Sequence, residues 1–307
     1  MGVSNGVLQE FEAQHRNPNI TLGAEEDAIV NLVEAFFTRL AHQAICLVGA
    51  RDPEMIIVAK ALFRSRRCAI DSAFVFTSLL DAREALIRIS LGLLSLPLGL
   101  VAERFRAWCS TFDKFCFENQ SQLSGLREMR TLKLLGVYKK YMEVELEVRA
   151  VSSLDDPSVW DSYCPDFSAM VDKLRQILAM DHAEPGESHH IPEPHFQMEV
   201  GVIAALYGTI IRCRDPMIRR RALATLESSD IQEGLWNSKR GSAISRRVME
   251  LEEQGQHIST CGDIPKEARI IKVIPRSGIE NDDSVYFQFL HGWKRETFSQ
   301  LDKALVW

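Results

Sequence analysis

Apolar residues recur at steps of three and four along most of this chain, and proline or glycine interrupts each series. Such spacing places apolar side chains on one face of an α-helix. Clear examples are the aromatic series Phe105, Trp108, Phe112 and Phe115 and the apolar series from Phe167 to Leu178. Hydrophobic residues make up 46% of the 307 positions, enough to bury these faces against one another. The pattern therefore predicts a mainly α fold of about eight to ten helices.

We expect a single helical domain spanning residues 21–307. Residues 1–20 are polar and contain Asn17-Pro18-Asn19, which predicts a polar leader before the first helix. Residues 181–197 hold three prolines and four histidines without helical spacing, so we expect a loop there, not a domain boundary.

The last fifty or so residues have a different pattern. Ile270–Ile274 and Val285–Phe289 are β-branched or aromatic runs separated by turn-forming residues. They predict a small β-hairpin near residues 270–290. Residues 295–306 are expected to close the chain as a short helix.

The charge balance argues against direct contact with nucleic acid, because the net charge is −6 and phosphate neutralisation requires a basic surface. The most apolar run, Leu91–Val101, is too short to span a bilayer and contains Pro97, so we expect no membrane partner. Seven scattered cysteines, an odd number, indicate free thiols in a reducing compartment. We therefore expect an intracellular protein, cytoplasmic or nuclear. The sequence leaves the oligomeric state open.

Four segments in order carry a resemblance to a known family: Cys213–Ala222, Glu233–Asn237, Arg247–Glu253 and Ile264–Ile270. Together with Trp160-Asp161 upstream, they resemble the end of the regulatory domain of fungal zinc-cluster transcription factors. The resemblance covers roughly residues 75–307 and implies a helical regulatory domain.

The zinc cluster of that family has no counterpart in this chain. The family holds two metal ions with closely paired cysteines, whereas no Cys-x-x-Cys occurs here. We therefore expect a chain that does not read DNA by itself, either a fragment of a longer factor or a protein that has left transcription.

Five arginines lie within ten residues, and their guanidinium groups suit two different partners. They are Arg212, Arg214, Arg219, Arg220 and Arg221. As a diphosphate site, the group would use Arg214 and Arg219. As structural residues, the arginines would pair with acids such as Glu233, Glu252 and Glu253, and this interpretation is favoured because the pattern recurs in the relatives that the resemblance implies.

Aromatic side chains give the candidate ligand-binding residues. Trp108, Phe112, Tyr141 and Tyr207 fall on apolar helix faces and could line a cavity for a small apolar molecule. Plain core packing explains each residue equally well.

Two function classes remain open. The first is a regulatory-domain-like binding module for an apolar metabolite or a protein partner. The second is a repurposed enzyme of fungal specialised metabolism, such as a noncanonical class I terpene cyclase acting on an isoprenoid diphosphate, which would require magnesium. Its acidic motifs are not intact, because Asp155-Asp156 precedes a proline and Asp282-Asp283 falls in the predicted hairpin. We assign no catalytic residue, and the cofactor is otherwise unknown.

We assign no metal site either. Glu143 and Glu147 share a helix face, but Lys139, Lys140 and Arg149 lie within pairing distance along the helix. The four histidines of residues 181–197 lie among prolines that deny them a fixed geometry.

Overall fold

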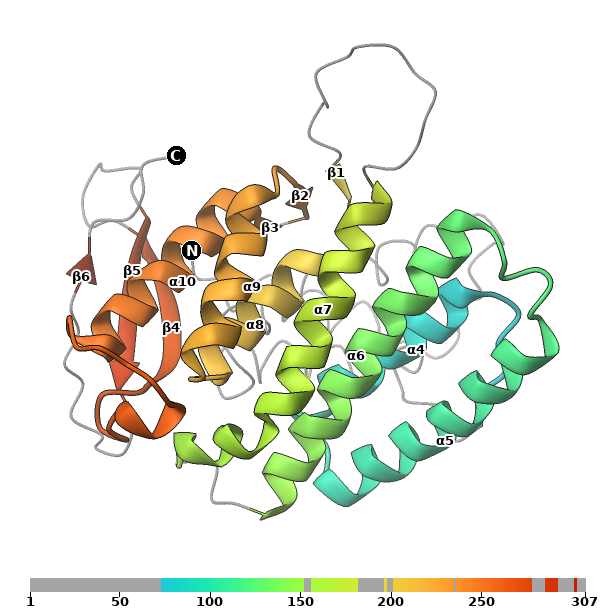
Figure 1. Ribbon diagram of the computed structural model, residues 1–307. Helices are drawn as coiled ribbons and strands as arrows, with labels where there is room; N and C mark the ends of the chain where they lie inside the picture. Colours follow the sequence, from blue (N-terminus) through green and yellow to red (C-terminus); the bar gives the residue numbers. More distant parts are fainter. Residues whose placement is uncertain are drawn as a thin grey trace, which may run out of the picture.

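The computed structural model describes residues 73–151, 156–181, 196–197, 201–234, 236–277, 285–291 and 301–302. Within these ranges the fold is mainly helical, with seven α-helices and a small antiparallel sheet near the C-terminus (Figure 1). The predicted fold class is confirmed. The leader at 1–20 and the helices expected before residue 73 lie outside the described residues.

The helices, in chain order, are α4 (Leu79–Gly92), α5 (Leu98–Glu118), α6 (Leu126–Val151), α7 (Cys164–Asp181), α8 (Val202–Arg212), α9 (Pro216–Ser228) and α10 (Ser238–Glu253). Two short 3-10 helices are η1 (Pro157–Tyr163) and η2 (Cys261–Asp263). The strands are β1 (Phe196–Gln197), β2 (Gln232–Glu233), β3 (Trp236–Asn237), β4 (Ile270–Ser277), β5 (Val285–His291) and β6 (Leu301–Asp302).

Local sequence signals explain where several helices begin. Asp215 caps α9, because its Oδ1 accepts the backbone N–H groups of Met217 and Ile218, both at 3.0 Å. Pro216 occupies the first helical position, where its missing N–H costs nothing. The dipeptide Asp215-Pro216 is therefore the local sequence signal for the start of α9.

The predicted hairpin is present as β4 and β5, which pair antiparallel from Ile270 opposite His291 to Ser277 opposite Val285. The prediction of a closing helix over 295–306 is wrong at Leu301–Asp302. These two residues form β6 and pair with Gln288 and Phe287 of β5. The free edge of β5 offers backbone hydrogen bonds that local helical spacing does not reveal.

The loop expected at 181–197 is only partly described. Helix α7 ends at Asp181, as the loss of helical spacing predicts. Residues 182–195 lie outside the described residues. Phe196–Gln197 form β1, which pairs parallel with β2, so this end of the segment adds a strand to a second small sheet.

Two large apolar clusters form most of the described core, and α6 lies between them. A third, small cluster consists of Ile258, Ile264 and Ala268. The main cluster runs from α6 to β5 and includes Val137 and Val144 of α6. The α5 cluster comprises Ala82, Leu86, Ile89, Val101, Phe105, Trp108, Phe112, Leu135 and Met142. Helix α6 is therefore buried on two faces, and α4 and α5 pack on the side of α6 away from α8 (Figure 1).

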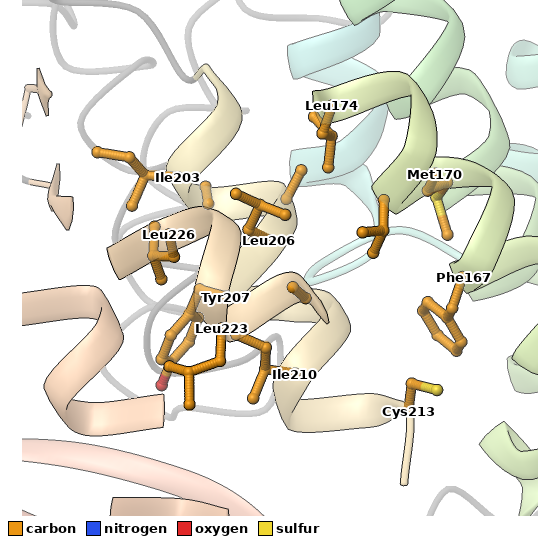
Figure 2. Packing of buried hydrophobic residues seen from close by; sticks show 14 of the residues in the cluster. Phe167, Met170, Leu174, Ile203, Leu206, Tyr207, Ile210, Cys213, Leu223 and Leu226 are labelled. Carbon is orange, nitrogen blue, oxygen red and sulfur yellow. The ribbon is translucent and has the colours of Figure 1, made fainter. Parts of the chain in front are cut away.

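Helix α8 is the centre of the main cluster, since every residue from Val202 to Ile210 is buried. Figure 2 shows Leu206 and Ile210 between side chains of α7 and α9, with Ile203 beside Leu226 of α9. Gly208 permits the approach of α6, because a Cβ at this position would lie 2.4 Å from Tyr141 Oη. A helix surrounded in this way is apolar on all sides, as the sequence of α8 is.

Among the described residues, no helix combines the length and the apolar character needed to cross a membrane.

Trp108 is expected to be a large contributor to stability. Its ring is fully buried, stacks on Phe112 with centroids 4.7 Å apart, and donates Nε1–H to the carbonyl of Ala82 at 2.7 Å. We expect Trp108→Ala to lower the free energy of unfolding by about 3–5 kcal/mol. Chemical denaturation measures this, with Phe117→Ala as control, because Phe117 lies on the same helix and is 76% exposed. Equal losses in the two variants would contradict the assignment of Trp108 to the core.

Candidate functional site

Two of the five arginines in the arginine-rich segment, Arg214 and Arg219, are buried. Arg214 Nη2 donates to Glu252 Oε1 at 2.9 Å, and Arg219 Nη2 donates to Glu252 Oε2 at 2.7 Å. The side chains of Arg214, Arg219 and Glu252 are 2%, 0% and 0% exposed. This buried triad joins the start of α9 to the end of α10.

The triad also holds the first strand of the C-terminal sheet. The backbone N–H of Ile270 donates to Glu252 Oε1 at 2.6 Å, and Arg214 Nη2 donates to the Ile270 carbonyl at 2.8 Å. Burial opposes ionisation of Glu252, but the charges of Arg214 and Arg219 outweigh it and hold the pKa of this carboxyl below its usual value. The residues proposed for a diphosphate are therefore engaged with a buried carboxylate.

The other three arginines of the segment also pair with carboxylates, and Arg212 does so with Glu145. Arg220 pairs with Glu253 at 2.8 Å and Arg221 with Asp172 at 2.9 Å. The pairing predicted for Glu252 and Glu253 is confirmed. Only Arg212 lies between aromatic rings, as described below.

Glu233 has a different role from the predicted arginine partner. Its carboxylate accepts the N–H groups of Val202 at 2.8 Å and Ile203 at 3.0 Å, so it caps the buried start of α8. A Cβ on Gly201 would lie 2.1 Å from Glu233 Oε1, which explains the glycine. Burial raises the pKa of Glu233 to about 7, although the N–H donors favour the charged form.

A second ion pair, between the buried Arg269 and the partly exposed Asp161, was not predicted. Arg269 donates from Nη1 and Nη2 to the two carboxylate oxygens of Asp161 at 2.9 and 2.8 Å, and also to the Cys261 carbonyl at 2.7 Å. It connects η1, η2 and the start of β4. Both residues belong to segments singled out in the sequence, and this is the signal that could have identified them. Three of these segments contact one another and hold elements of the fold together: residues 213–222, 247–253 and 264–270.

The four predicted ligand-binding residues do not come together. Trp108 and Phe112 belong to the α5 cluster, whereas Tyr207 belongs to the main cluster and Tyr141 packs against it. Helix α6 separates the two pairs. A cavity between α4 and α6 has a volume of about 20 Å³ and is lined by none of the four. That volume suits a single water molecule.

Arg212, Tyr141 and Trp160 form a partly exposed group that we call the Arg212 stack. The Arg212 guanidinium carbon lies 5.3 Å from the ring centroid of Tyr141 and 5.1 Å from that of Trp160. These distances are typical of cation–π contacts. The Arg212 side chain is 20% exposed, and its Nε lies 3.7 Å from Glu145 Oε2.

Three separate elements position the Arg212 stack. Tyr141 lies on α6, Trp160 on η1 and Arg212 at the end of α8. Glu145 is held in place by Arg149, whose Nε donates to Glu145 at 2.8 Å and whose Nη1 donates to the Leu93 carbonyl at 3.0 Å. Sequence analysis found Tyr141 and Arg212 in unrelated patterns, since only the fold brings them together.

The carboxylates considered as metal ligands have protein partners. Asp156 accepts from Ser158 and pairs with Lys266 at 2.6 Å, and the Lys266 hydrogen bond lowers the pKa of Asp156 to about 2. Glu143 pairs with Lys140 at 2.6 Å. The four loop histidines, Asp155 and Asp282-Asp283 lie outside the described residues.

Comparisons with known protein families, curated proteins and solved structures found no match.

Glu233 predicts a specific pH dependence of stability. Its pKa is about 7 in the fold and 4.5 in a model peptide, so between these values the folded chain keeps a proton that the unfolded chain releases. The free energy of unfolding then falls as pH rises through this window. Between about pH 4.5 and pH 7, we expect the free energy of unfolding of wild type to fall by roughly 3 kcal/mol more than that of Glu233→Gln.

Urea denaturation across this pH range measures the difference. Glu118→Gln is the matched control, because the Glu118 side chain is 56% exposed at the end of α5. Parallel profiles for wild type and Glu233→Gln would contradict the raised pKa.

Proposed function

We propose that this chain is a helical binding module that docks a protein partner through the Arg212 stack and does not itself contact DNA. The observation that carries the proposal is the composition and placement of the stack. An arginine held between a tyrosine and a tryptophan remains partly exposed at the junction of α6, η1 and α8.

Arginine, tyrosine and tryptophan are the residues that contribute most often to binding energy at protein interfaces. In the Arg212 stack the guanidinium is already ordered by two rings and by Glu145, so binding requires little further loss of side-chain freedom. The flat ring and guanidinium surfaces suit an apolar or aromatic side chain of a partner, with polar groups around it.

The alternative of a small apolar ligand has less support. Phe105, Trp108 and Phe112 stack on one another, with ring centroids 6.1 and 4.7 Å apart. The faces of these rings are therefore occupied by packing contacts within the core. The cavity of about 20 Å³ between α4 and α6 is far smaller than sites that enclose a small organic molecule.

The cyclase alternative also has less support. A diphosphate needs accessible cations, and both Arg214 and Arg219 are buried against Glu252. Displacing Glu252 would leave its charge unpaired in the core. Asp156, the described member of the acidic pair, is engaged with Lys266 and Ser158.

Arg212→Gln tests the proposal because it removes the cation while keeping a side chain of similar polarity. We expect a partner that binds wild type to bind Arg212→Gln at least about tenfold more weakly. Arg246→Gln is the control, since Arg246 also makes one surface ion pair, with Glu227, but lies on α10 away from the stack. Thermal melts of both variants verify that they fold.

The partner is identified by quantitative affinity capture with wild type and both variants, then purified and titrated against each by calorimetry. Equal affinity for wild type and Arg212→Gln would contradict the proposed site. Turnover of farnesyl diphosphate with magnesium by wild type would favour the enzyme class. Sequence-selective DNA binding by the isolated chain would contradict the absence of direct DNA contact.

A further inference from the structure

Three cysteines far apart in the sequence lie near one another in the fold. Cys164 begins α7, Cys213 follows the last residue of α8, and Cys261 begins η2. The Sγ atoms of Cys164 and Cys213 are 3.8 Å apart. The pKa of the Cys261 thiol is raised to about 11, mainly by burial and in part by the nearby thiol of Cys164.

The sulfur atoms of Cys164 and Cys213 lie close enough for oxidation to join them in a disulfide bond. The two sulfur atoms are already in contact, and a disulfide bond of about 2.05 Å needs them to approach by less than about 2 Å. Cys164 is partly exposed, so a small oxidant can reach it, whereas Cys213 is buried. Among the described cysteines, Cys109 and Cys116 lie on α5.

The two thiols also differ in how readily they lose a proton. The hydrogen bond from Cys164, together with the backbone N–H of Asp215, lowers the pKa of Cys213. The same thiol–thiol hydrogen bond and burial raise the pKa of Cys164. Cys213 is therefore the thiolate-forming member of the pair, and thiolates are the nucleophiles in disulfide formation.

We propose that Cys164 and Cys213 form a reversible disulfide when the protein meets a hydroperoxide. The Cys164 thiol first passes its proton to the Cys213 thiolate that it contacts. The Cys164 thiolate attacks the peroxide oxygen, the O–O bond breaks, and the leaving hydroxide takes a proton from solvent, so that a sulfenic acid and water form when hydrogen peroxide is the oxidant. Cys213 sulfur then attacks Cys164 sulfur and displaces hydroxide, which takes the Cys213 proton and leaves as water. Two thiols lose two electrons, and one peroxide is reduced to two water molecules.

The disulfide would constrain the region next to the Arg212 stack. Cys213 directly follows Arg212, and Cys164 lies four residues after Trp160. The bond would join the start of α7 to the connection between α8 and α9, and would close a segment of about fifty residues. The inference rests on the thiols alone and does not depend on the proposed function.

The full chain treated with hydrogen peroxide, alkylated and digested provides the test. We expect a linked Cys164–Cys213 peptide, lighter by two hydrogens than the separate peptides, that disappears after dithiothreitol. We also expect oxidation to raise Tm by about 5 °C or more, because the cross-link restricts the unfolded chain.

Three variants give the comparison. Cys164→Ser replaces the partly exposed partner and should lose both the linked peptide and the Tm shift. Cys213→Ser should do the same if it folds, and Cys109→Ser on α5 should behave as wild type. Absence of the linked peptide in wild type, or the same Tm shift in Cys164→Ser, would overturn the proposal.

Discussion

Glu252 accepts hydrogen bonds from two arginines and one backbone amide in a part of the core that excludes water. A lone carboxylate there would be costly, and so would either arginine without it. The three charges are therefore stable only when α9, α10 and β4 are all in place. Arg269 and Asp161 extend the same dependence to η1 and η2, so the helical core and the C-terminal sheet require each other.

This arrangement also determines where function can reside. Several charged residues of the segments singled out in the sequence are buried, and most of the arginine-rich segment joins one element to another. The buried ones are Arg214, Arg219, Glu252 and Arg269. Arg212 differs from its neighbours because it ends α8 and its guanidinium lies between two rings. A cluster that suggests phosphate binding in the sequence thus becomes a structural junction. All five of its arginines pair with carboxylates, and Arg212 also lies against aromatic rings.

Local signals in the sequence were sufficient for much of the fold. Helical spacing located α5 and α7, Asp215-Pro216 located the start of α9, and the β-branched runs located β4 and β5. Contacts between distant segments were less accessible. Glu233 was expected to pair with the arginine-rich segment but caps α8. Trp108 and Tyr207 lie in different clusters, which a one-dimensional pattern cannot show because it does not reveal that α6 lies between them.

A double-mutant cycle between Arg219 and Glu252 tests most directly whether the buried triad holds the fold together. Urea denaturation would give the free energy of unfolding for wild type, Arg219→Met, Glu252→Gln and the double variant. The account predicts that Glu252→Gln costs about 3–5 kcal/mol, because it leaves two buried arginines without a counter-charge. It also predicts that the two effects do not add. The loss of unfolding free energy in the double variant should be at least about 1 kcal/mol smaller than the sum of the losses in the two single variants. Single losses below about 0.5 kcal/mol, or losses that simply add, would contradict it.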